Sequence, residues 1–453
     1  MISATDTPAP PLLDSHLNLT PGDLSLLTDL YQLTMSACYL GEELEQYRAS
    51  FELFTRHLPA HFGYLIAMGL EPVLEYLTHW HFSDQQIAAL QTTGIFTNAP
   101  KNFWSLLANA EFTGDVWGVP EGTAIFAHEP LLRIEAPLWQ AQLIETYLLN
   151  AINYQTLIAT KAARLRDVAG DDATLLEFGT RRAFSPQASL WAARAALAAG
   201  FNHTSNVLAA LQLGQTPSGT LAHSLVMAMS AVKGSEEAAF RAFHRYFPGA
   251  PLLIDTYDTL EAARNLADKR ARGEIEVTGV RLDSGDLVSL SQQVRALLPD
   301  VKIFASGDLD EAEIQRLKEA DACIDGYGLG TKLVTGVPVN GVYKLVEIDG
   351  IPVSKKSTGK VTYPGRKQIW RTLENGQLQG DCLDLASQDH TVSDHKFPLL
   401  ELVMKNGKRL TSPTPLGEIA QRTRESVISL PSTARLITNP ISPLVEIGAG
   451  LKK

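Results

Sequence analysis

Cysteine is scarce in this sequence, which contains only Cys38, Cys323 and Cys382 among its 453 residues. No two of them form a CxxC pair or have the spacing of zinc ligands, so a disulfide framework and a cysteine-based metal site are excluded. This cysteine usage is typical of a reducing compartment, and we therefore expect a cytoplasmic protein.

Long hydrophobic runs are also absent. No stretch of about 18 apolar residues occurs, so we expect no membrane-spanning helix. The first residues lack the basic start and the apolar stretch of a signal peptide.

Basic residues are fewer than acidic ones, 39 against 50, which gives a net charge of −11. This balance argues against nucleic-acid binding, although local basic clusters can still bind anionic substrates.

The remaining composition, 45% hydrophobic and 20% charged, is that of an ordinary globular protein. Its pattern divides the chain into four parts. We expect a flexible tail at 1–22 and the N-terminal part of a smaller α/β domain at 23–139. An α/β barrel with the active site is expected at 140–340, and a C-terminal segment that packs on the N-terminal domain at 341–453.

Strand and helix patterns alternate in the predicted barrel. Strands are predicted at 173–177, 252–255, 278–283, 301–306 and 323–328, and helices after Ser185-Pro186 and at 258–272, 286–298 and 309–319. Most of the strand ends recur every 20–30 residues or so, the length of a βα unit, which predicts parallel strands in an irregular TIM-like barrel. Elsewhere the pattern predicts helices at 25–40, 66–76 and 140–165 and a strand at 50–53.

Polar residues follow the predicted strands, where barrels place their active sites. The last two loops are typical of phosphate binding, because glycines let the backbone approach an oxyanion and a helix N-terminus favours an anion. The predicted phosphate ligands are Ser306, Gly307, Asp308, Gly328, Gly330 and Thr331. A plain tight turn explains either loop alone, but the pair fits a barrel phosphate site.

Four carboxylates at strand ends allow two interpretations. Asp255, Asp258, Asp283 and Asp286 could hold Mg²⁺ and position sugar hydroxyls. Alternatively, Asp258 and Asp286 cap the helices that follow them. We favour a functional role for Asp283, as a possible Mg²⁺ ligand, and leave the role of Asp258 open.

His223 lies among small residues in Gly-Thr-Leu-Ala-His-Ser, which leaves room for a bulky group on its imidazole. Neutral imidazole is a nucleophile near pH 7, but a structural histidine is an equally good interpretation.

Residues 355–371 form a basic cluster that contains no acidic residue: Lys355, Lys356, Lys360, Arg366, Lys367 and Arg371. It is either a solvated hairpin or a polyphosphate clamp, and Arg181, Arg182 and Lys161 add cations nearer the barrel.

Many segments of residues 24–371 together resemble the nicotinate phosphoribosyltransferases, which are type II phosphoribosyltransferases. The segments are LLTDLYQLTM (26–35), FELFTRHLP (51–59), GYLIAMGL (63–70), PEGTAIF (120–126), QLIETYLLNAINYQTLIATKAAR (142–164), EFGTRRAFSP (177–186), TSNVLA (204–209), GTLAHS (219–224), DTYDT (255–259), VRLDSGDL (280–287), ASGDLDE (305–311), YGLGTKLVT (327–335) and GVYKLVE (341–347). Residues beyond 372 show no such match.

The resemblance implies an enzyme that forms nicotinate mononucleotide and pyrophosphate from nicotinate and phosphoribosyl pyrophosphate, with Mg²⁺ and coupled ATP hydrolysis, in NAD salvage. It also implies a homodimer with shared active sites, an α/β barrel or funnel domain, and a smaller α/β domain from both chain ends.

Roles transfer with the motifs. His223 is similar to the histidine that ATP phosphorylates, and Asp283 to a carboxylate near the ribose and metal. Phe178 resembles the aromatic residue that stacks on the pyridine ring, while Tyr31 and Arg56 resemble residues that the partner subunit delivers. The resemblance further implies that Arg181 and Arg281 meet the pyridine carboxylate or phosphates, and we expect Lys161 among the substrate-binding residues.

Ser205 bears on whether the substrate is nicotinate, the acid, or nicotinamide, the amide. The related nicotinamide enzymes carry an aspartate there, and a carboxylate would repel nicotinate, so Ser205 favours the acid. The chain departs from the family pattern at His203, where glycine is common, and at Thr358, where glutamate is more usual.

Three alternatives remain. A transferase for nicotinamide or quinolinate is disfavoured by Ser205 and the GTLAHS motif. A metal-dependent barrel hydrolase or aldolase would need histidine-rich ligand spacing or a Schiff-base lysine, which the sequence does not show. A non-catalytic phosphate-binding or scaffold protein would show no turnover.

Overall fold

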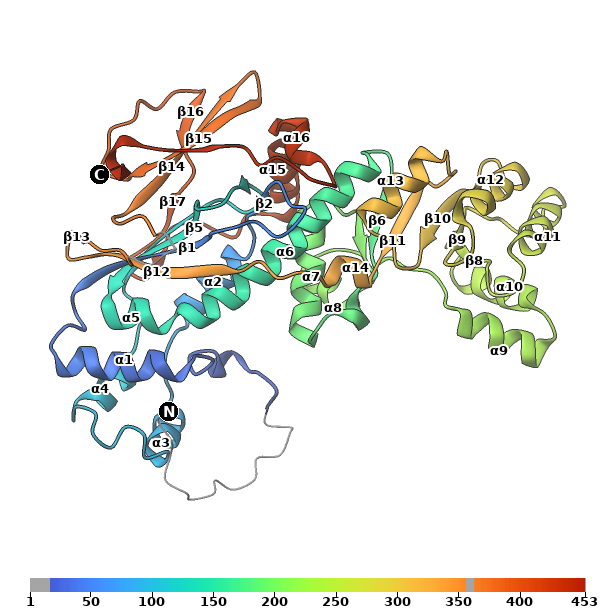
Figure 1. Cartoon of the computed structure of the whole chain (residues 1–453). Helices are drawn as coiled ribbons and strands as arrows, with labels where there is room; N and C mark the ends of the chain where they lie inside the picture. The colour runs from blue at the N-terminus through green and yellow to red at the C-terminus, as the bar shows by residue number, and fades with distance from the viewer. Residues whose placement is uncertain (1–16, 356–361, 453) are drawn as a thin grey trace.

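The computed structural model describes residues 17–355 and 362–452. A long helix, α6 (Glu145–Ala169), runs diagonally between two parts of the molecule (Figure 1). On one side lies an antiparallel sheet built from N-terminal and C-terminal segments of the described residues, and on the other a parallel sheet with its helices. Residues 1–16 of the predicted tail lie outside the described residues, and a short turn, η2 (Pro21–Asp23), falls near its end.

The larger antiparallel sheet joins segments from both ends of the chain. Its spatial order is β13 (Ile351–Pro352), β12 (Gly341–Ile348), β1 (Arg48–Thr55), β5 (Pro130–Pro137), β3 (Asp115–Gly118), β17 (Glu401–Lys405) and β18 (Lys408–Arg409). Strand β12 follows the parallel strands in sequence but pairs with β1, with Phe51 opposite Leu345. The segment after residue 340 therefore completes a sheet that the N-terminal part begins.

Smaller sheets and helices surround this one. A further sheet has the order β16 (Lys396–Pro398), β14 (Lys367–Glu374), β15 (Gln377–Leu385) and β19 (Val445–Ile447), and β2 (Leu65–Ile66) pairs with β4 (Ala124–Ile125). The helices of this part are α1 (Leu30–Gly41), α2 (Leu70–Thr78), α3 (Asp84–Thr92), α4 (Phe103–Ala108), α5 (Leu138–Leu143), α15 (Leu416–Ser429) and α16 (Ser432–Arg435), with the turn η4 (Ala449–Leu451) near the end.

Among the described residues, six parallel strands form the barrel-like part. Their order is β7 (His203–Thr204), β6 (Thr174–Glu177), β11 (Gly326–Leu329), β10 (Lys302–Ser306), β9 (Gly279–Leu282) and β8 (Leu252–Leu253). The helices are α7 (Pro186–Ala198), α8 (Val207–Gln212), α9 (His223–Lys233), α10 (Glu236–Tyr246), α11 (Thr259–Ala271), α12 (Leu287–Leu297), α13 (Glu311–Glu319) and α14 (Thr331–Val334), after the turn η3 (Thr180–Arg182). The predicted α/β class and the predicted parallel strands are confirmed.

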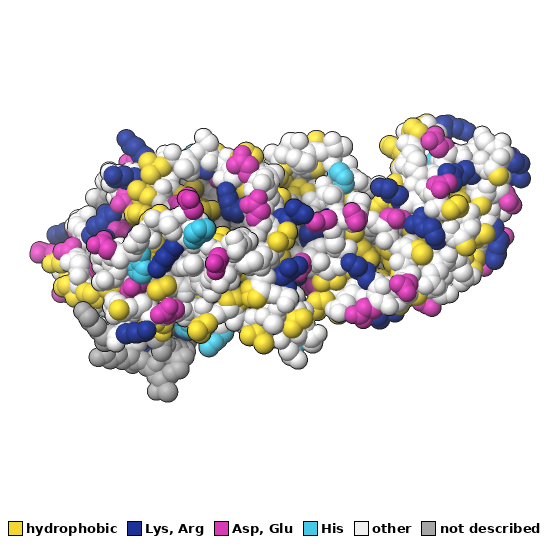
Figure 2. Space-filling model, turned by 90° about the horizontal axis from the view of Figure 1, so that it is seen from above, with side chains coloured by type: hydrophobic (Ala, Val, Ile, Leu, Met, Phe, Trp, Pro, Cys, Tyr) yellow, Lys and Arg dark blue, Asp and Glu magenta, His cyan; other side chains and the backbone are white. Residues whose placement is uncertain are grey.

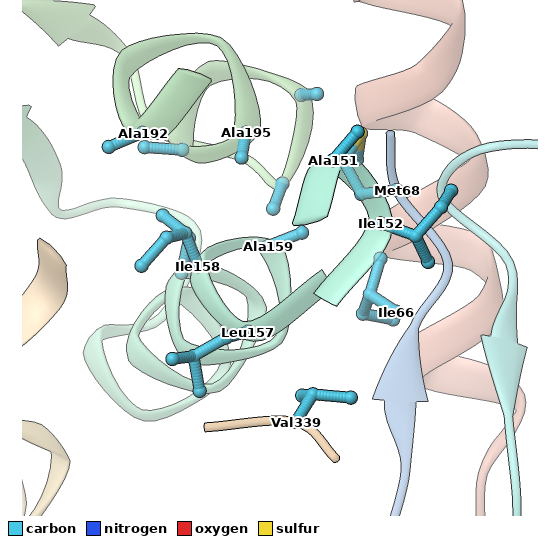
Figure 3. Close-up of a cluster of buried hydrophobic side chains, with 14 of the residues drawn as sticks. Ile66, Met68, Ala151, Ile152, Leu157, Ile158, Ala159, Ala192, Ala195 and Val339 are labelled. Carbon is cyan, nitrogen blue, oxygen red and sulfur yellow. The ribbon is translucent and has the colours of Figure 1, made fainter. Parts of the chain in front are cut away.

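Helix α6 is apolar on several sides because it packs against both parts of the molecule. In Figure 3 its side chains meet Ile66 and Met68 on one side and Ala192 and Ala195 of α7 on another. The alanines let α6 and α7 approach closely, and their burial removes apolar surface from water on both helices. The helix thereby fixes the parallel sheet relative to the antiparallel one.

Three predicted helices differ from the structure in their bounds. The helix predicted at 66–76 starts at Leu70, because residues 65–66 pair with β4 and Gly69 turns the chain with a φ of +100°. The helix predicted at 25–40 starts at Leu30, after a series of turns. The helix predicted at 140–165 is two helices, α5 and α6, which meet at Ile144.

The helix-start signals in the barrel are confirmed. Ser185 caps α7 by accepting a hydrogen bond from the Ala188 N–H at 3.0 Å, and Pro186 is the first helical residue. Among the described residues, no helix is both long and apolar enough to cross a membrane. On the face shown in Figure 2, basic and acidic side chains of the described residues are interspersed, so this face has no continuous basic surface for nucleic acid.

Candidate active site

A cavity of about 500 Å³ opens at the carboxyl ends of the parallel strands, where this kind of sheet gathers its loops. Its lining residues are Phe178, Arg181, Arg182, Ser205, Gly219, Thr220, Leu221, Ala222, His223, Arg281, Asp283, Ser306, Gly307, Asp308, Gly328, Gly330 and Thr331. Twelve of the residues predicted from the sequence are in this set, so the structure brings them to one place. Tyr31, Arg56 and Lys161 are not among them.

The two predicted phosphate loops lie side by side because β10 and β11 are adjacent parallel strands. Gly307 has a φ of +96°, and a Cβ there would lie 2.3 Å from the carbonyl oxygen of Asp283. A Cβ at Gly328 would lie 2.6 Å from the ring of Phe178. Only glycine therefore allows these loops to pack against the neighbouring loops and still present backbone N–H groups to the cavity.

Phe178 and Arg281 face each other across the cavity. The guanidinium carbon of Arg281 lies 5.9 Å from the centre of the Phe178 ring, and its Nη1 donates to Thr220 Oγ1 at 2.6 Å. Its Nε is buried and has no partner among the described residues. Burial lowers the pKa of Arg281, and the nearby Asp283 and Asp255 carboxylates oppose this effect. Arg281 thus offers an unused charged donor beside an aromatic ring, which suits an anionic aromatic ligand.

Glu177 supports the loop that carries Phe178, a role that the sequence did not reveal. Its carboxylate is buried and accepts hydrogen bonds from the Gly179 N–H and from Thr204 Oγ1, the latter at 2.5 Å. Burial raises the pKa of Glu177. Ser205 also belongs to this support, since its hydroxyl donates to the Glu177 carbonyl at 3.1 Å. His203, on strand β7, is exposed and does not line the cavity.

His223 is the first residue of α9 and its side chain is 39% exposed. Its Nδ1 lies 3.1 Å from the Thr256 hydroxyl oxygen. Its Nε2 lies 3.9 Å from Asp255 Oδ1 and 3.8 Å from Asp283 Oδ2. The imidazole is therefore held between a hydroxyl and two carboxylates, with part of its surface open to a ligand. Thr256 is a further site residue, and its place after a predicted strand did not by itself single it out.

Asp255 and Asp283 are the carboxylates that reach the site. Asp255 is buried, and its Oδ2 accepts from the Asp283 N–H at 2.8 Å and from Ser284 Oγ at 2.7 Å. Its Oδ1 has no hydrogen-bond partner among the described residues. Asp283 Oδ1 accepts from the Ser306 hydroxyl, which ties the metal-ligand candidate to the phosphate loop. Mg²⁺ is commonly held by one or two carboxylates together with substrate phosphates, so this pair fits the ion.

Asp258 and Asp286 cap helices instead. Asp258 accepts from the Glu261 N–H at 2.9 Å at the start of α11, and Asp286 accepts from the Val288 N–H at 3.2 Å at the start of α12. Neither lines the cavity. Among the described residues, no group of three or more histidine, cysteine or acidic side chains could hold a metal ion. The metal-only centre expected of a barrel hydrolase thus has no counterpart there.

Three predicted ligands lie away from this cavity within the chain. Tyr31 lines a different cavity of about 470 Å³, and its hydroxyl donates to Glu145 Oε2 at 3.3 Å. The guanidinium of Arg56 lies over the ring of Phe54, with 5.8 Å to its centre. The Lys161 ammonium donates to backbone carbonyls of residues 332 and 335.

The basic cluster at 355–371 is partly committed to ion pairs. Lys367 is buried against Glu52 at 2.8 Å, and Arg371 against Asp381 at 2.5 Å. Arg366 pairs with Glu347 at 2.9 Å. Lys367 and Arg366 therefore balance carboxylates of the larger antiparallel sheet, and Arg371 balances one on the neighbouring strand of its own sheet. Lys356, Lys360 and the departure at Thr358 lie outside the described residues.

Comparison with known proteins decides the family. The chain matches the nicotinate phosphoribosyltransferase N-terminal domain over residues 26–153 and the nicotinate phosphoribosyltransferase family over residues 173–362. The chain belongs to the nicotinate phosphoribosyltransferase family. It is 42% identical to nicotinate phosphoribosyltransferase pncB2 of Mycobacterium tuberculosis over 91% of this chain and 88% of that protein. The Bacillus subtilis nicotinate phosphoribosyltransferase is also 42% identical, over 82% of this chain and 78% of its own.

The fold agrees with this assignment. The crystal structure of human nicotinic acid phosphoribosyltransferase superimposes with a TM-score of 0.82 and 29% identity, covering 94% of this chain and 98% of that chain. Family membership confirms the prediction of an enzyme with a barrel-like domain and a smaller α/β domain. The hydrolase and scaffold interpretations are thereby set aside.

Proposed function

We propose that the protein transfers the phosphoribosyl group of phosphoribosyl pyrophosphate to the ring nitrogen of nicotinate, coupled to ATP hydrolysis through His223. One observation carries this proposal. A single cavity brings together the aromatic ring of Phe178, the guanidinium of Arg281 with its unpaired Nε, two glycine-containing loops suited to phosphate, and a histidine beside two carboxylates. This inventory matches a reaction whose substrates are an aromatic acid and phosphates.

Each substrate group has a partner of suitable chemistry. The pyridine ring stacks on Phe178, and its carboxylate accepts from Arg281, whose Nε is otherwise unpaired. The 5′-phosphate binds the N–H groups of the loops at 306–308 and 328–331, and Arg181 contributes charge at the rim. Ser205 is neutral and near the ring site, so it does not repel the acid as a carboxylate would.

The transfer step needs orientation and charge stabilisation more than a strong base. The nicotinate nitrogen forms a bond to the ribose C1 while the bond from C1 to the pyrophosphate oxygen breaks, and pyrophosphate leaves with the electron pair. Asp283 lies near the sugar, and the loops hold its phosphate so that nitrogen and C1 approach in line. Bound through Asp283 and Asp255, Mg²⁺ would neutralise charge on the pyrophosphate.

The surroundings of His223 favour one tautomer. Two carboxylates near Nε2 favour a proton on that nitrogen, which leaves the lone pair on Nδ1, beside the Thr256 hydroxyl. Nδ1 then attacks the γ-phosphorus of ATP, an N–P bond forms, and the bond to the β-phosphate oxygen breaks with release of ADP. Hydrolysis of the phosphohistidine returns the imidazole and releases phosphate.

We also infer a cytoplasmic homodimer. The cysteine usage supports the compartment, since the three thiols are unpaired. The position of Tyr31 and Arg56 outside the cavity of their own chain supports shared sites, to which the partner subunit would deliver them.

The proposal is tested by measuring nicotinate mononucleotide formed from phosphoribosyl pyrophosphate and Mg²⁺, with nicotinate or nicotinamide, and with or without ATP. We expect product from nicotinate, a stimulation of about tenfold or more by ATP, and no comparable product from nicotinamide. His223→Ala should abolish the ATP stimulation and the acid-labile phosphate that [γ-³²P]ATP leaves on the parent protein.

His395→Ala is the matched control, because His395 is exposed and far from the cavity. It should retain both the stimulation and the label. Product from nicotinamide alone would contradict the argument from Ser205, and label that persists in His223→Ala would contradict the role of His223. Absence of product with either base would overturn the proposal as a whole.

A further inference from the structure

The phosphate loop after β11 continues into a very short helix whose far end is bound by side chains of α6. Helix α14 has only four residues, Thr331 to Val334, so its two ends are separated by about 6 Å. Gly330 and Thr331, at its start, line the cavity. A displacement at the carbonyl end of so short a helix is therefore carried directly to the residues that meet the phosphate.

Lys161 binds the carbonyl end. Its ammonium donates to the carbonyl oxygen of Lys332 and, at 2.7 Å, to that of Thr335. A Cβ at Gly336 would lie 3.3 Å from the Lys161 nitrogen, so glycine leaves the ammonium the space to approach these carbonyls. Burial lowers the pKa of Lys161, while the Glu311 and Asp310 carboxylates oppose this effect.

Tyr154 binds the same end. Its hydroxyl donates to the Val334 carbonyl at 3.0 Å. Tyr154 and Lys161 are seven residues apart on α6, which is two turns, so both lie on one face of the helix. Between them lies Leu157, whose Cδ1 would be 3.9 Å from a Cβ at Gly336, in the segment after α14, and Figure 3 shows Leu157 and Val339 on the same side of the cluster. Carbonyls of residues 332, 334 and 335 are thus all held by a single rigid helix.

Helix α6 is well suited to this task because it is the longest helix of the described residues and is packed on both sides. The carbonyls at the end of a helix lack intrahelical partners, and hydrogen bonds from charged donors contribute more than neutral ones. Loss of the Lys161 ammonium would leave two carbonyls unsatisfied and free the turn to shift.

We propose that Lys161 and Tyr154 are positioning residues for the 5′-phosphate loop, which they hold from behind through α14 without touching the substrate. This differs from the direct ligand that the sequence suggested for Lys161. The inference rests on the proposed function, since it assumes that the loop at 328–331 binds the phosphate of the ribosyl donor.

The test compares steady-state constants of the parent with those of Lys161→Met, which keeps the length of the side chain but removes its donors. We expect the KM for phosphoribosyl pyrophosphate to rise about tenfold, which corresponds to about 1.4 kcal/mol. The KM for nicotinate should stay within about twofold, because the Glu177 carboxylate also holds the loop that carries Phe178, and Thr220 holds Arg281. Lys161→Arg should recover most of the loss by donating to the same carbonyls.

Lys318→Met is the matched control. The Lys318 ammonium also binds two backbone carbonyls, those of Val168 at 2.7 Å and Ala169 at 3.0 Å, but at the end of α6 and away from the cavity. It should lower thermal stability to a similar degree and leave both KM values unchanged. An equal rise of the KM for phosphoribosyl pyrophosphate in this variant would mean a general effect of stability and would overturn the inference.

Tyr154→Phe separates positioning from direct binding. If Lys161 acts through α14, Tyr154→Phe raises the same KM, and the double variant shows less than the sum of the two effects, because both act on one element. An unchanged KM in Tyr154→Phe, or additive effects, would overturn the inference.

If the parent forms no product, the proposed function fails, and calorimetric binding of ribose 5-phosphate then decides the inference. Lys161→Met must weaken that binding about tenfold, and equal binding would overturn it.

Discussion

Gly307 connects the phosphate loop to the carboxylate loop through its backbone conformation. Its φ of +96° is strained for any residue with a Cβ, and such an atom would lie 2.3 Å from the Asp283 carbonyl. We predict that Gly307→Ala raises the KM for phosphoribosyl pyrophosphate by about tenfold or more. The same substitution should lower the free energy of unfolding by about 1 kcal/mol or more. Steady-state kinetics and denaturant titration measure the two effects.

Gly273 provides the control for the conformational part of this effect. It has a φ of +72°, and a Cβ there meets nothing within 4 Å. Gly273→Ala should lose about 1 kcal/mol of stability from the backbone conformation and keep its kinetic constants. Equal kinetic effects in the two variants would show that the contact between Gly307 and Asp283 does not shape the site.

Individual site residues were predictable where a strand-end rule applies to them. Ser306, Gly307 and Gly328 follow predicted parallel strands, and the structure places them in one cavity. Glu177 and Thr256 received no role, because their importance comes from contacts with loops that are distant in sequence. Lys161 shows the same limit, since nothing in the sequence reveals that its ammonium meets backbone carbonyls.

At the scale of elements, the start of α11 settles an ambiguity about Asp258. Its carboxylate caps the helix through the Glu261 N–H at 2.9 Å and does not line the cavity. We predict that Asp258→Ala lowers the free energy of unfolding by about 1 kcal/mol and leaves kcat/KM within about twofold. Denaturant titration and steady-state kinetics test this.

Asp258→Ser should restore most of the lost stability, because a serine hydroxyl also accepts from the first turn. Asp283→Ala, one strand further along the parallel sheet, should instead lose activity, since Asp283 lines the cavity. A large loss of kcat/KM in both Asp258→Ala and Asp258→Ser would mean that Asp258 acts in the reaction.

Helices and strands could be predicted best where the hydrophobic periodicity agrees with the residues that mark their ends. The start of α7 at Pro186 follows directly from the serine and proline there, and five of the six described parallel strands fall within the predicted ranges or one residue beyond them. Strand β7 was not predicted, because its two residues are too few to show a strand pattern. The predicted start of α2 at residue 66 was wrong, because the long-range pairing of residues 65–66 with β4 overrides the helical pattern. The break between α5 and α6 has no proline or glycine to announce it.

At the scale of the whole molecule, the alternation of strands and helices indicated the parallel sheet, but not which distant strands complete the antiparallel one. Strand β12 pairs with β1, and β17 pairs with β3, although hundreds of residues separate the two strands of each pair in sequence. The register depends on side-chain packing across the sheet, which a single sequence does not reveal. The matching family segments nevertheless indicated that both ends belong to one smaller domain.

The proposed dimer is a further property at this scale, and mixed dimers test it. Arg56 lies outside the cavity of its own chain, whereas His223 lines it. We predict that Arg56→Ala and His223→Ala each lose most of their ATP-stimulated activity. Dimers re-formed from an equal mixture of the two variants should recover about a quarter of the parent activity, since half are mixed and each mixed dimer has one intact site.

A second mixture distinguishes shared sites from simple stabilisation by a partner. His223 and Asp283 line the same cavity of one chain, so His223→Ala mixed with Asp283→Ala gives dimers in which both sites carry a defect. That mixture should recover no activity, because no arrangement of the two chains completes a site. Recovery in both mixtures would show that exchange of subunits restores activity for another reason, and recovery in neither would show that Arg56 serves its own chain.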